Sequence, residues 1–352
     1  MGINKHLATN QSVHFRAGIR NELDIFIKEI GCSRALVLST PGHADAARDL
    51  AEKLGSITVG AFTGAKMHTP VEVTAKALEH AKHVNADCLV SVGGGSTTGL
   101  SKAIALHTDL PQIIIPTTYA GSEATPILGQ TEDGIKTTIK DDRVLPEIIL
   151  YDPELVVTLP SHLSVSSGLN AMAHSVEGLY AKDRSDDFTQ IAMDGLQYFV
   201  SSLPDVLVNP ENIKAREDTL RGAWACGTVL GNVGMALHHK LCHTLGGSFD
   251  LPHAETHAII LPHAIAYNAL AVPDLLEPLG AMLNNRDTGK AVWEFAKSLG
   301  APLSLGELGM KEGDINLAVD IAVTNPYWNP REITRDGIHQ LLRNAWAGSV
   351  PE

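Results

Sequence analysis

The feature that most constrains this fold is a series of short apolar segments, each separated from the next by a helical pattern. The apolar segments lie at residues 34–39, 57–62, 88–92, 112–116 and 148–152, with helical patterns at 44–54, 71–84 and 98–106. Strands that are half exposed alternate apolar with polar residues, whereas these segments are apolar almost throughout. Unbroken apolar strands that alternate with helices favour a parallel sheet covered on both faces. The first part of the chain is therefore predicted to be an α/β domain.

The pattern changes near residue 160. Apolar residues then recur with a period close to four, in stretches at 164–180, 187–203, 213–241 and 273–283, and strand-like runs nearly vanish. A chain of 352 residues is also long enough that two domains are the default expectation. We therefore predict an α/β domain at 1–156 and an all-helical domain at 157–352.

Charge and cysteine usage exclude several classes of protein. The net charge of −13 disfavours binding to nucleic acid or to an anionic membrane surface. The four cysteines, at positions 32, 88, 226 and 242, form no CxxC pair and are predicted to be reduced thiols. The first residues lack the apolar core of a signal peptide, and no apolar run approaches the roughly 20 residues of a membrane helix. We expect a soluble cytoplasmic protein with a small-molecule partner.

Two polar turns in the first domain suggest a nucleotide. Gly93, Gly94, Gly95 and Ser96 lie between a buried strand and a helix, where glycines let the backbone approach phosphate oxygens. The GxGxxG pattern is not met, since Thr98 occupies its third glycine position, and a tight strand-to-helix connection is the alternative.

The second turn contains Thr117 and Thr118, which follow another buried strand. Ligands of open α/β sheets bind at this edge, although these hydroxyls could instead cap a helix. Ser39 and Thr40 stand where Rossmann-like folds usually place an acidic residue that binds the ribose 2′-hydroxyl. Weak discrimination between NADH and NADPH is therefore expected.

Histidines are concentrated in the second domain. His239 and His243 lie four residues apart, so on a helix they share a face, and a break at Gly246–Gly247 would return His253 towards them. Asn170 and His174 likewise share a face of a predicted helix. Three imidazoles and one oxygen suit a first-row divalent ion, yet a neutral amide binds such an ion far more weakly than a carboxylate. Proton chemistry and buried core histidines are the other interpretations.

These motifs, in this order and spacing, resemble the iron-containing alcohol dehydrogenase superfamily across nearly the whole chain. The resemblance implies a dinucleotide-binding domain joined to a helical domain, in a dehydroquinate-synthase-like architecture, and a homodimer. In that superfamily an aspartate and three histidines hold the metal, and they match Asn170, His174, His239 and His253. It also implies that His243 lies near the nicotinamide. The superfamily's cofactor contacts match the glycine turn and the two threonines, with Lys136 as an addition.

The departures from the superfamily pattern indicate one branch. Asn170 replaces the metal-binding aspartate, and Ser39 and Thr40 replace the aspartate that binds the ribose. Together with the histidine-rich segments, these features resemble the branch that reduces the carbon–carbon double bond of 2-maleylacetate. The product is 3-oxoadipate, formed in bacterial catabolism of aromatic compounds with NADH or NADPH. We expect no essential metal. His243 and His253 would donate to the substrate, with His174 and His239 lining the pocket.

A dicarboxylate substrate requires cationic or hydrogen-bonding partners. The sequence offers Lys240, beside the histidines, and Tyr327, Arg331 and Arg335, in or after the aromatic loop at 325–330. Three alternatives remain open at this point. They are a metal-dependent alcohol dehydrogenase or lactaldehyde reductase, a dehydroquinate-synthase-like lyase, and a non-catalytic metal-binding protein.

Overall fold

The computed structural model describes residues 11–352, apart from the side chains of Ile135 and Lys136. Its internal contacts divide the chain into two units, which meet between Leu159 and Pro160. The predicted boundary lay three residues earlier. Each unit is described by itself below.

The first unit is a parallel sheet with helices on both faces, as predicted. Its strands run in the order β1-β8-β5-β4-β2-β3, and every neighbouring pair is parallel. The bounds are β1 Ser12–Phe15, β2 Ala35–Leu38, β3 Thr58–Phe62, β4 Cys88–Gly93, β5 Gln112–Pro116 and β8 Ile148–Tyr151. The helices are α1 Leu23–Glu29, α2 Ala44–Leu54, α3 Val71–His83 and α4 Gly95–Thr108.

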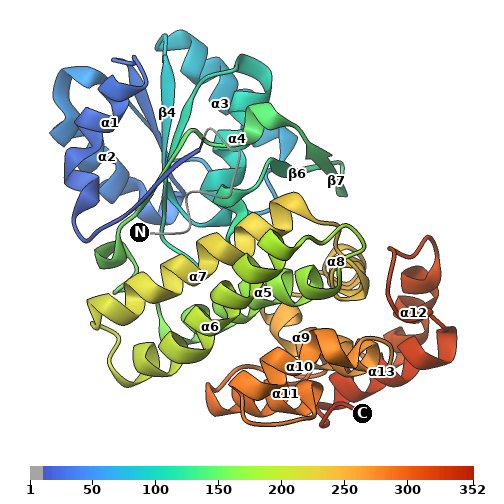
Figure 1. Ribbon diagram of the computed structural model, residues 1–352. Helices are drawn as coiled ribbons and strands as arrows, with labels where there is room; N and C mark the ends of the chain where they lie inside the picture. The colour runs from blue at the N-terminus through green and yellow to red at the C-terminus, as the bar shows by residue number, and fades with distance from the viewer. Residues whose placement is uncertain (1–10) are drawn as a thin grey trace. The chain divides into compact units, whose positions relative to one another are not determined.

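Alternation along the buried strands explains the two layers of helices. In β2, Ala35 and Val37 pack with residues of α1 and α2 on one face. Leu36 and Leu38 pack with residues of α3 and α4 on the other. Successive side chains of a strand point to opposite faces, so an entirely apolar strand needs cover on both sides. Figure 1 shows α1 and α2 on one side of the sheet and α3 and α4 on the other.

Three strands of this unit were not predicted. Strand β1 pairs with β8 at the edge of the sheet. An antiparallel hairpin, β6 Ile127–Glu132 and β7 Ile135–Lys140, forms a separate two-stranded sheet. These strands carry polar residues at many positions, and they lack the continuous apolar run that marks the central strands.

The second unit is helical throughout its described residues. Its helices are α5 Ser161–Tyr180, α6 Asp186–Val208, α7 Ile213–Asn232, α8 Leu237–Phe249, α9 His253–Ala269, α10 Pro273–Met282, α11 Thr288–Ser298, α12 Ile315–Val323 and α13 Arg335–Ala347. Side-chain caps start several of them; Ser185, for example, accepts from the amide of Phe188 at the start of α6. Helix α5 packs against α6, α7 and α9, and it is buried without interruption from Ser164 to Tyr180.

The prediction of one helix over 213–241 was wrong. The chain leaves the helix after Asn232 and begins α8 at Leu237. Two carboxylates, in or just after α5, accept hydrogen bonds from backbone amides between α7 and α8. Asp183 accepts from Gly234 at 2.9 Å, and Glu177 accepts from Ala236 at 2.7 Å. Amides at a helix start have no partner within their own helix, and these acceptors satisfy two of the amides at the break.

The predicted turn at Gly246–Gly247 was also wrong. Both glycines lie inside α8, which continues to Phe249 and ends at Asp250 in the left-handed conformation, with φ of 53°. Pro252 then precedes the first residue of α9. A glycine lowers helix stability by only about 1 kcal/mol, so the packing of α8 against α9 and α12 overrides it. Among the described helices, none is long and apolar enough to cross a membrane.

Candidate active site

Three helices of the second unit carry the histidine cluster. Helix α5 contributes Asn170, His174 and Glu177, which lie at helical spacings that share one face. Helix α8 contributes His238, His239, Cys242 and His243, and α9 contributes His253 and His257. The cluster combines buried members with two histidines, His243 and His253, that are exposed.

Glu177 fixes the orientation of the cluster. Its carboxylate has no exposed surface and accepts hydrogen bonds at 2.7 Å from the amides of Ala236 and His238 and from Nδ1 of His239. His239 is therefore protonated at Nδ1. When the ring is neutral, its Nε2 is an acceptor, and it lies 3.0 Å from Nδ1 of His174. The donor in this second contact is then His174, whose own Nε2 carries a lone pair.

A second imidazole pair lies beside the first. His238 Nε2 and His257 Nδ1 are 3.0 Å apart, and Sγ of Cys242 is 3.6 Å from the same His238 nitrogen. Burial lowers the pKa of both histidines well below the usual value, and neighbouring imidazoles lower it further, so both rings are neutral. The outer nitrogens, Nδ1 of His238 and Nε2 of His257, are buried without a hydrogen-bond partner within residues 11–352.

The exposed side of the cluster meets the loop that follows α12. The hydroxyl of Tyr327 lies 3.1 Å from Nδ1 of His243, and Nζ of Lys240 lies 5.9 Å from the centre of the Tyr327 ring. Partial burial raises the pKa of Tyr327, and the charge of Glu177 adds to the effect, so the phenol is protonated. This hydroxyl is a hydrogen-bond donor at the edge of the histidine cluster.

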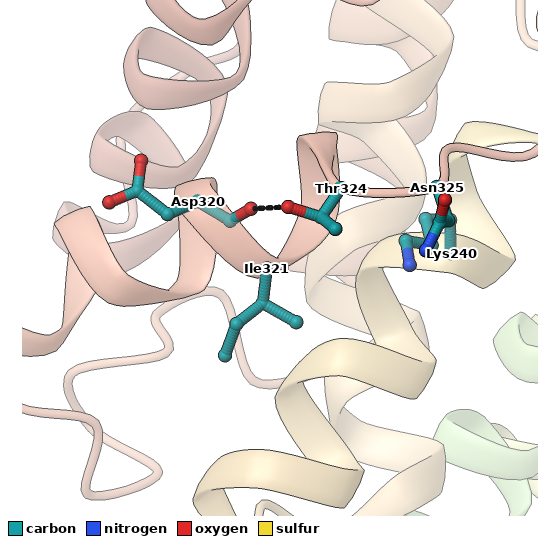
Figure 2. A pocket seen from close by; sticks show the side chains of 5 residues that line it. All are labelled: Lys240, Asp320, Ile321, Thr324 and Asn325. Atoms are coloured by element: carbon teal, nitrogen blue, oxygen red, sulfur yellow. Dashed lines mark hydrogen bonds between the residues drawn. The ribbon is translucent and has the colours of Figure 1, made fainter.

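A pocket of about 470 Å³ opens next to this edge (Figure 2). Lys240 of α8 and Asp320, Ile321, Thr324 and Asn325 line it. Figure 2 shows the Asp320 carboxylate pointing away from Lys240, and that carboxylate accepts a hydrogen bond from Arg335. Lys240 is therefore the cation that this pocket presents to a ligand.

The family's metal-ligand positions do not form a strong donor set for a divalent ion. The position of the aspartate is taken by Asn170, whose Oδ1 is buried and has no hydrogen-bond partner in the described chain. His174 and His239 satisfy one another at 3.0 Å. Three neutral imidazoles and a neutral amide leave the charge of a divalent ion uncompensated among the direct ligands. These residues are a weaker donor set for a divalent ion than an aspartate with three histidines.

The two polar turns of the first unit converge, although the sequence places them more than 20 residues apart. Strands β4 and β5 are neighbours, and the amide of Thr117 donates to the carbonyl of Gly93 at 3.0 Å. A Cβ on Gly94 would lie 2.8 Å from Cγ2 of Thr118, so only glycine permits this approach. Helix α4 begins at Gly95 without a side-chain cap, which leaves its first amides available to an anion. The turns fit the phosphates of a dinucleotide.

Two other predicted cofactor contacts differ from these turns. Ser39 is buried, and its hydroxyl donates to the carbonyl of Val92 at 3.3 Å, which argues against contact with a ribose. Thr40 is less buried, and its hydroxyl lies 3.1 Å from Nδ1 of His43. Lys136 lies in β7, but its side chain is outside the described part of the structure.

Arg331 is occupied by a structural role. Its guanidinium stacks at 4.0 Å over the ring of Tyr267 and donates to the carbonyl of that residue at 2.9 Å. These contacts anchor the loop between α12 and α13, so Arg331 is a weaker candidate for the substrate than Lys240.

Sequence reasoning missed Glu177 and His257 as members of the site. Glu177 stands three residues after His174 on α5, and His257 four residues after His253 on α9. Those spacings place each beside a predicted site residue, and this signal was available in the sequence.

Comparison with known proteins assigns the chain. The family model for iron-containing alcohol dehydrogenase matches residues 10–153, and the model for the C-terminal part of the Fe-containing alcohol dehydrogenase family matches residues 164–346. A maleylacetate reductase of Rhizobium sp. strain MTP-10005 is 56% identical over 93% of both chains. One from Sphingobium indicum is 50% identical over 96% of both.

Solved structures give the same picture. The crystal structure of a maleylacetate reductase from Agrobacterium tumefaciens superimposes with a TM-score of 0.96 at 54% identity, covering 98% of each chain. That of an iron-containing alcohol dehydrogenase from Corynebacterium glutamicum has a TM-score of 0.91 at 37% identity, over 96% of this chain and 94% of that one.

Proposed function

The chain belongs to the iron-containing alcohol dehydrogenase family, and from this premise we propose that it reduces 2-maleylacetate to 3-oxoadipate with NADH or NADPH, in the bacterial catabolism of aromatic compounds. It is an oxidoreductase with a nicotinamide cofactor. The observation that carries the substrate assignment is the 56% identity, over 93% of both chains, to a maleylacetate reductase. The neutral Asn170 at the position of the superfamily's aspartate supports it.

The reaction adds two electrons and two hydrogens across a double bond conjugated to a ketone. The reduced nicotinamide supplies a hydride to the alkene carbon remote from the ketone. The ketone oxygen then carries the negative charge of an enolate, and a proton added at the adjacent carbon completes the product. The charge is delocalised, so hydrogen-bond donors stabilise it without a metal; each oxyanion donor contributes roughly 3–4 kcal/mol.

His243 and Tyr327 are placed to supply such a donor. When Nδ1 of His243 carries no hydrogen, it accepts from the phenol of Tyr327 across the 3.1 Å contact, and the neutral ring has its hydrogen on Nε2. His243 is exposed, so this N–H can reach the enolate oxygen of a bound substrate, and exposed His253 is the second candidate donor. Glu177 holds His239, which in turn contacts His174, and we propose that these two rings line the pocket.

Lys240 binds a substrate carboxylate in this proposal. Its ammonium lines the pocket beside Tyr327, and the one carboxylate in that lining is paired with Arg335. A lysine in such a place attracts an anion as a point charge.

The proposal includes catalysis without an essential metal. It is supported by the neutral donor set at Asn170, His174, His239 and His253, which lacks the anionic ligand of the superfamily's pattern. A homodimer in the cytoplasm is proposed on the family resemblance alone, and light scattering of the purified protein tests the dimer.

Steady-state kinetics of metal-analysed protein test this function. Maleylacetate should be reduced with either cofactor, with one nicotinamide oxidised per substrate, and a chelator should leave the rate unchanged. A simple alcohol should give little turnover. Substituting His243→Ala should lower kcat about a hundredfold or more, the usual scale for acid–base assistance.

His162→Ala is the matched control, because His162 is exposed in the first turn of α5 and lies outside the cluster. Its kcat should equal that of the native chain. Turnover that is lost on chelation and restored by iron or zinc would contradict the metal-free mechanism. Oxidation of alcohols without reduction of maleylacetate would contradict the substrate.

A further inference from the structure

The buried group formed by His238, Cys242 and His257 has no role in the proposed reaction. The two α8 residues are four apart and share a face, and His257 comes from α9. One donor atom from each lies within 4.8 Å of the other two. We propose that this group, here called the buried thiol–imidazole site, binds copper(I), a soft monovalent cation.

The donor distances match a coordination shell. Metal–nitrogen bonds of about 2.0 Å and metal–sulfur bonds of about 2.3 Å separate neighbouring donors by roughly 3.3–3.7 Å. The observed separations are 3.0 Å between the two nitrogens and 3.6 Å between Nε2 of His238 and Sγ of Cys242. These two separations are close to those of a coordination shell, and all three donor atoms lie within 4.8 Å of one another.

Charge and donor type select the ion. Thiolate and imidazole are soft or borderline ligands, which favour copper(I) or zinc over hard ions. All three side chains are at most 1% exposed, so a net charge left in the site is costly. Copper(I) with one thiolate adds no net charge to the site, whereas zinc(II) with one thiolate adds a positive charge that the buried carboxylate of nearby Glu177 would partly offset. Copper(I) also accepts three ligands, while zinc requires a fourth.

An entry route is present on α9. His253 is exposed, and its ring centre lies 4.3 Å from that of buried His257, one helical turn further along. An ion captured by His253 therefore reaches the buried thiol–imidazole site through adjacent imidazoles. Binding involves no redox change: the Cys242 thiol loses one proton, a sulfur–copper bond forms, and the proton passes to solvent.

The experiment titrates tag-free, full-length protein with copper(I) under anaerobic conditions against a coloured competing chelator. The chain should bind copper(I) at this site, and Cys242→Ser should weaken that binding at least about 100-fold, since even changes behind a ligand cost 10–100-fold. Cys226→Ser is the matched control, because Cys226 is the other fully buried cysteine of the helical unit. It should bind as the native chain does.

A second pair of thiols needs its own control. Cys32 and Cys88 of the first unit lie in another group of donors within 4.8 Å. The titration is therefore repeated in Cys32→Ser, where the buried thiol–imidazole site should remain intact.

X-ray absorption of copper-loaded Cys32→Ser gives a readout that does not depend on how Cys242→Ser folds. One sulfur and two nitrogen neighbours are expected. Copper without a sulfur neighbour, equal affinity in Cys242→Ser, or zinc that displaces copper(I) at equal concentration would each overturn the proposal.

Discussion

Glu177 offers the sharpest test of how the site is held. Its carboxylate is fully buried and accepts three hydrogen bonds of 2.7 Å, one on Oε1 from His238 and two on Oε2 from Ala236 and His239. In Glu177→Gln the side chain keeps its shape but exchanges one acceptor oxygen for an NH₂ group. The best orientation keeps the carbonyl at the Oε2 position, and the NH₂ then faces the amide of His238.

The expected loss of stability follows from these contacts. One hydrogen bond to a charged group disappears, which costs roughly 1.5–3 kcal/mol, and a buried donor is left without an acceptor, which costs roughly 1–3 kcal/mol. The sum is about 2.5–6 kcal/mol. For a unit of this size each kcal/mol lowers the melting temperature by about 2–4 °C, so Tm should fall by roughly 5–24 °C.

Differential scanning calorimetry measures this change directly. Glu277→Gln is the control, since Glu277 is exposed on α10 in the same unit, and its Tm should move by no more than about 2 °C. Turnover should also fall in Glu177→Gln, because a neutral carbonyl holds the Nδ1–H of His239 more weakly than the carboxylate does. A Tm within about 2 °C of the native value would refute the argument that Glu177 joins α5 to the start of α8.

Three further predictions concern other parts of the molecule. Gly94→Ala should weaken NADH binding about tenfold or more in a fluorescence titration, because the added Cβ would collide with Thr118. Gly42→Ala is the control and should bind NADH normally, since no atom lies within 4 Å of the added Cβ. Lys102→Met should lower Tm, since buried Lys102 donates to the carbonyls of residues 122, 125 and 127, whereas exposed Lys53→Met should not. Burial lowers the pKa of His263 to about 4, below the 6.5 of the unfolded chain. The free energy of unfolding should therefore fall by about 1.4 kcal/mol for each pH unit as the pH is lowered from 6.5 to 4. Urea unfolding at several pH values should show a weaker pH dependence in His263→Gln.

The local pattern was sufficient for most of the architecture. The central strands and helices α2, α3 and α4 were predicted to within a few residues, because buried parallel strands are apolar throughout and their helices are amphipathic. The short helix α1 was not predicted. The edge strand β1 and the β6–β7 hairpin were missed, since their polar residues give no such signal. The all-helical second unit was predicted because its apolar period is long and sustained.

The candidate site divides in the same way. Spacings of three and four residues along one helix are local, and they placed Asn170 with His174 and His239 with His243. The sequence also revealed the neutral residue at position 170, which led to the metal-free proposal. The placement of Tyr327 against His243 required the folded chain, because 84 residues separate them.

The sequence by itself determined the fold class, the family and most of the candidate site residues. Only the tertiary structure decided where α7 ends and α8 begins, because the acceptors for the backbone amides at this break, Asp183 and Glu177, belong to a helix region about 50–60 residues away. It also decided that His238, Cys242 and His257 face one another. Contacts between helices depend on packing across the core, and no periodicity along one helix encodes them.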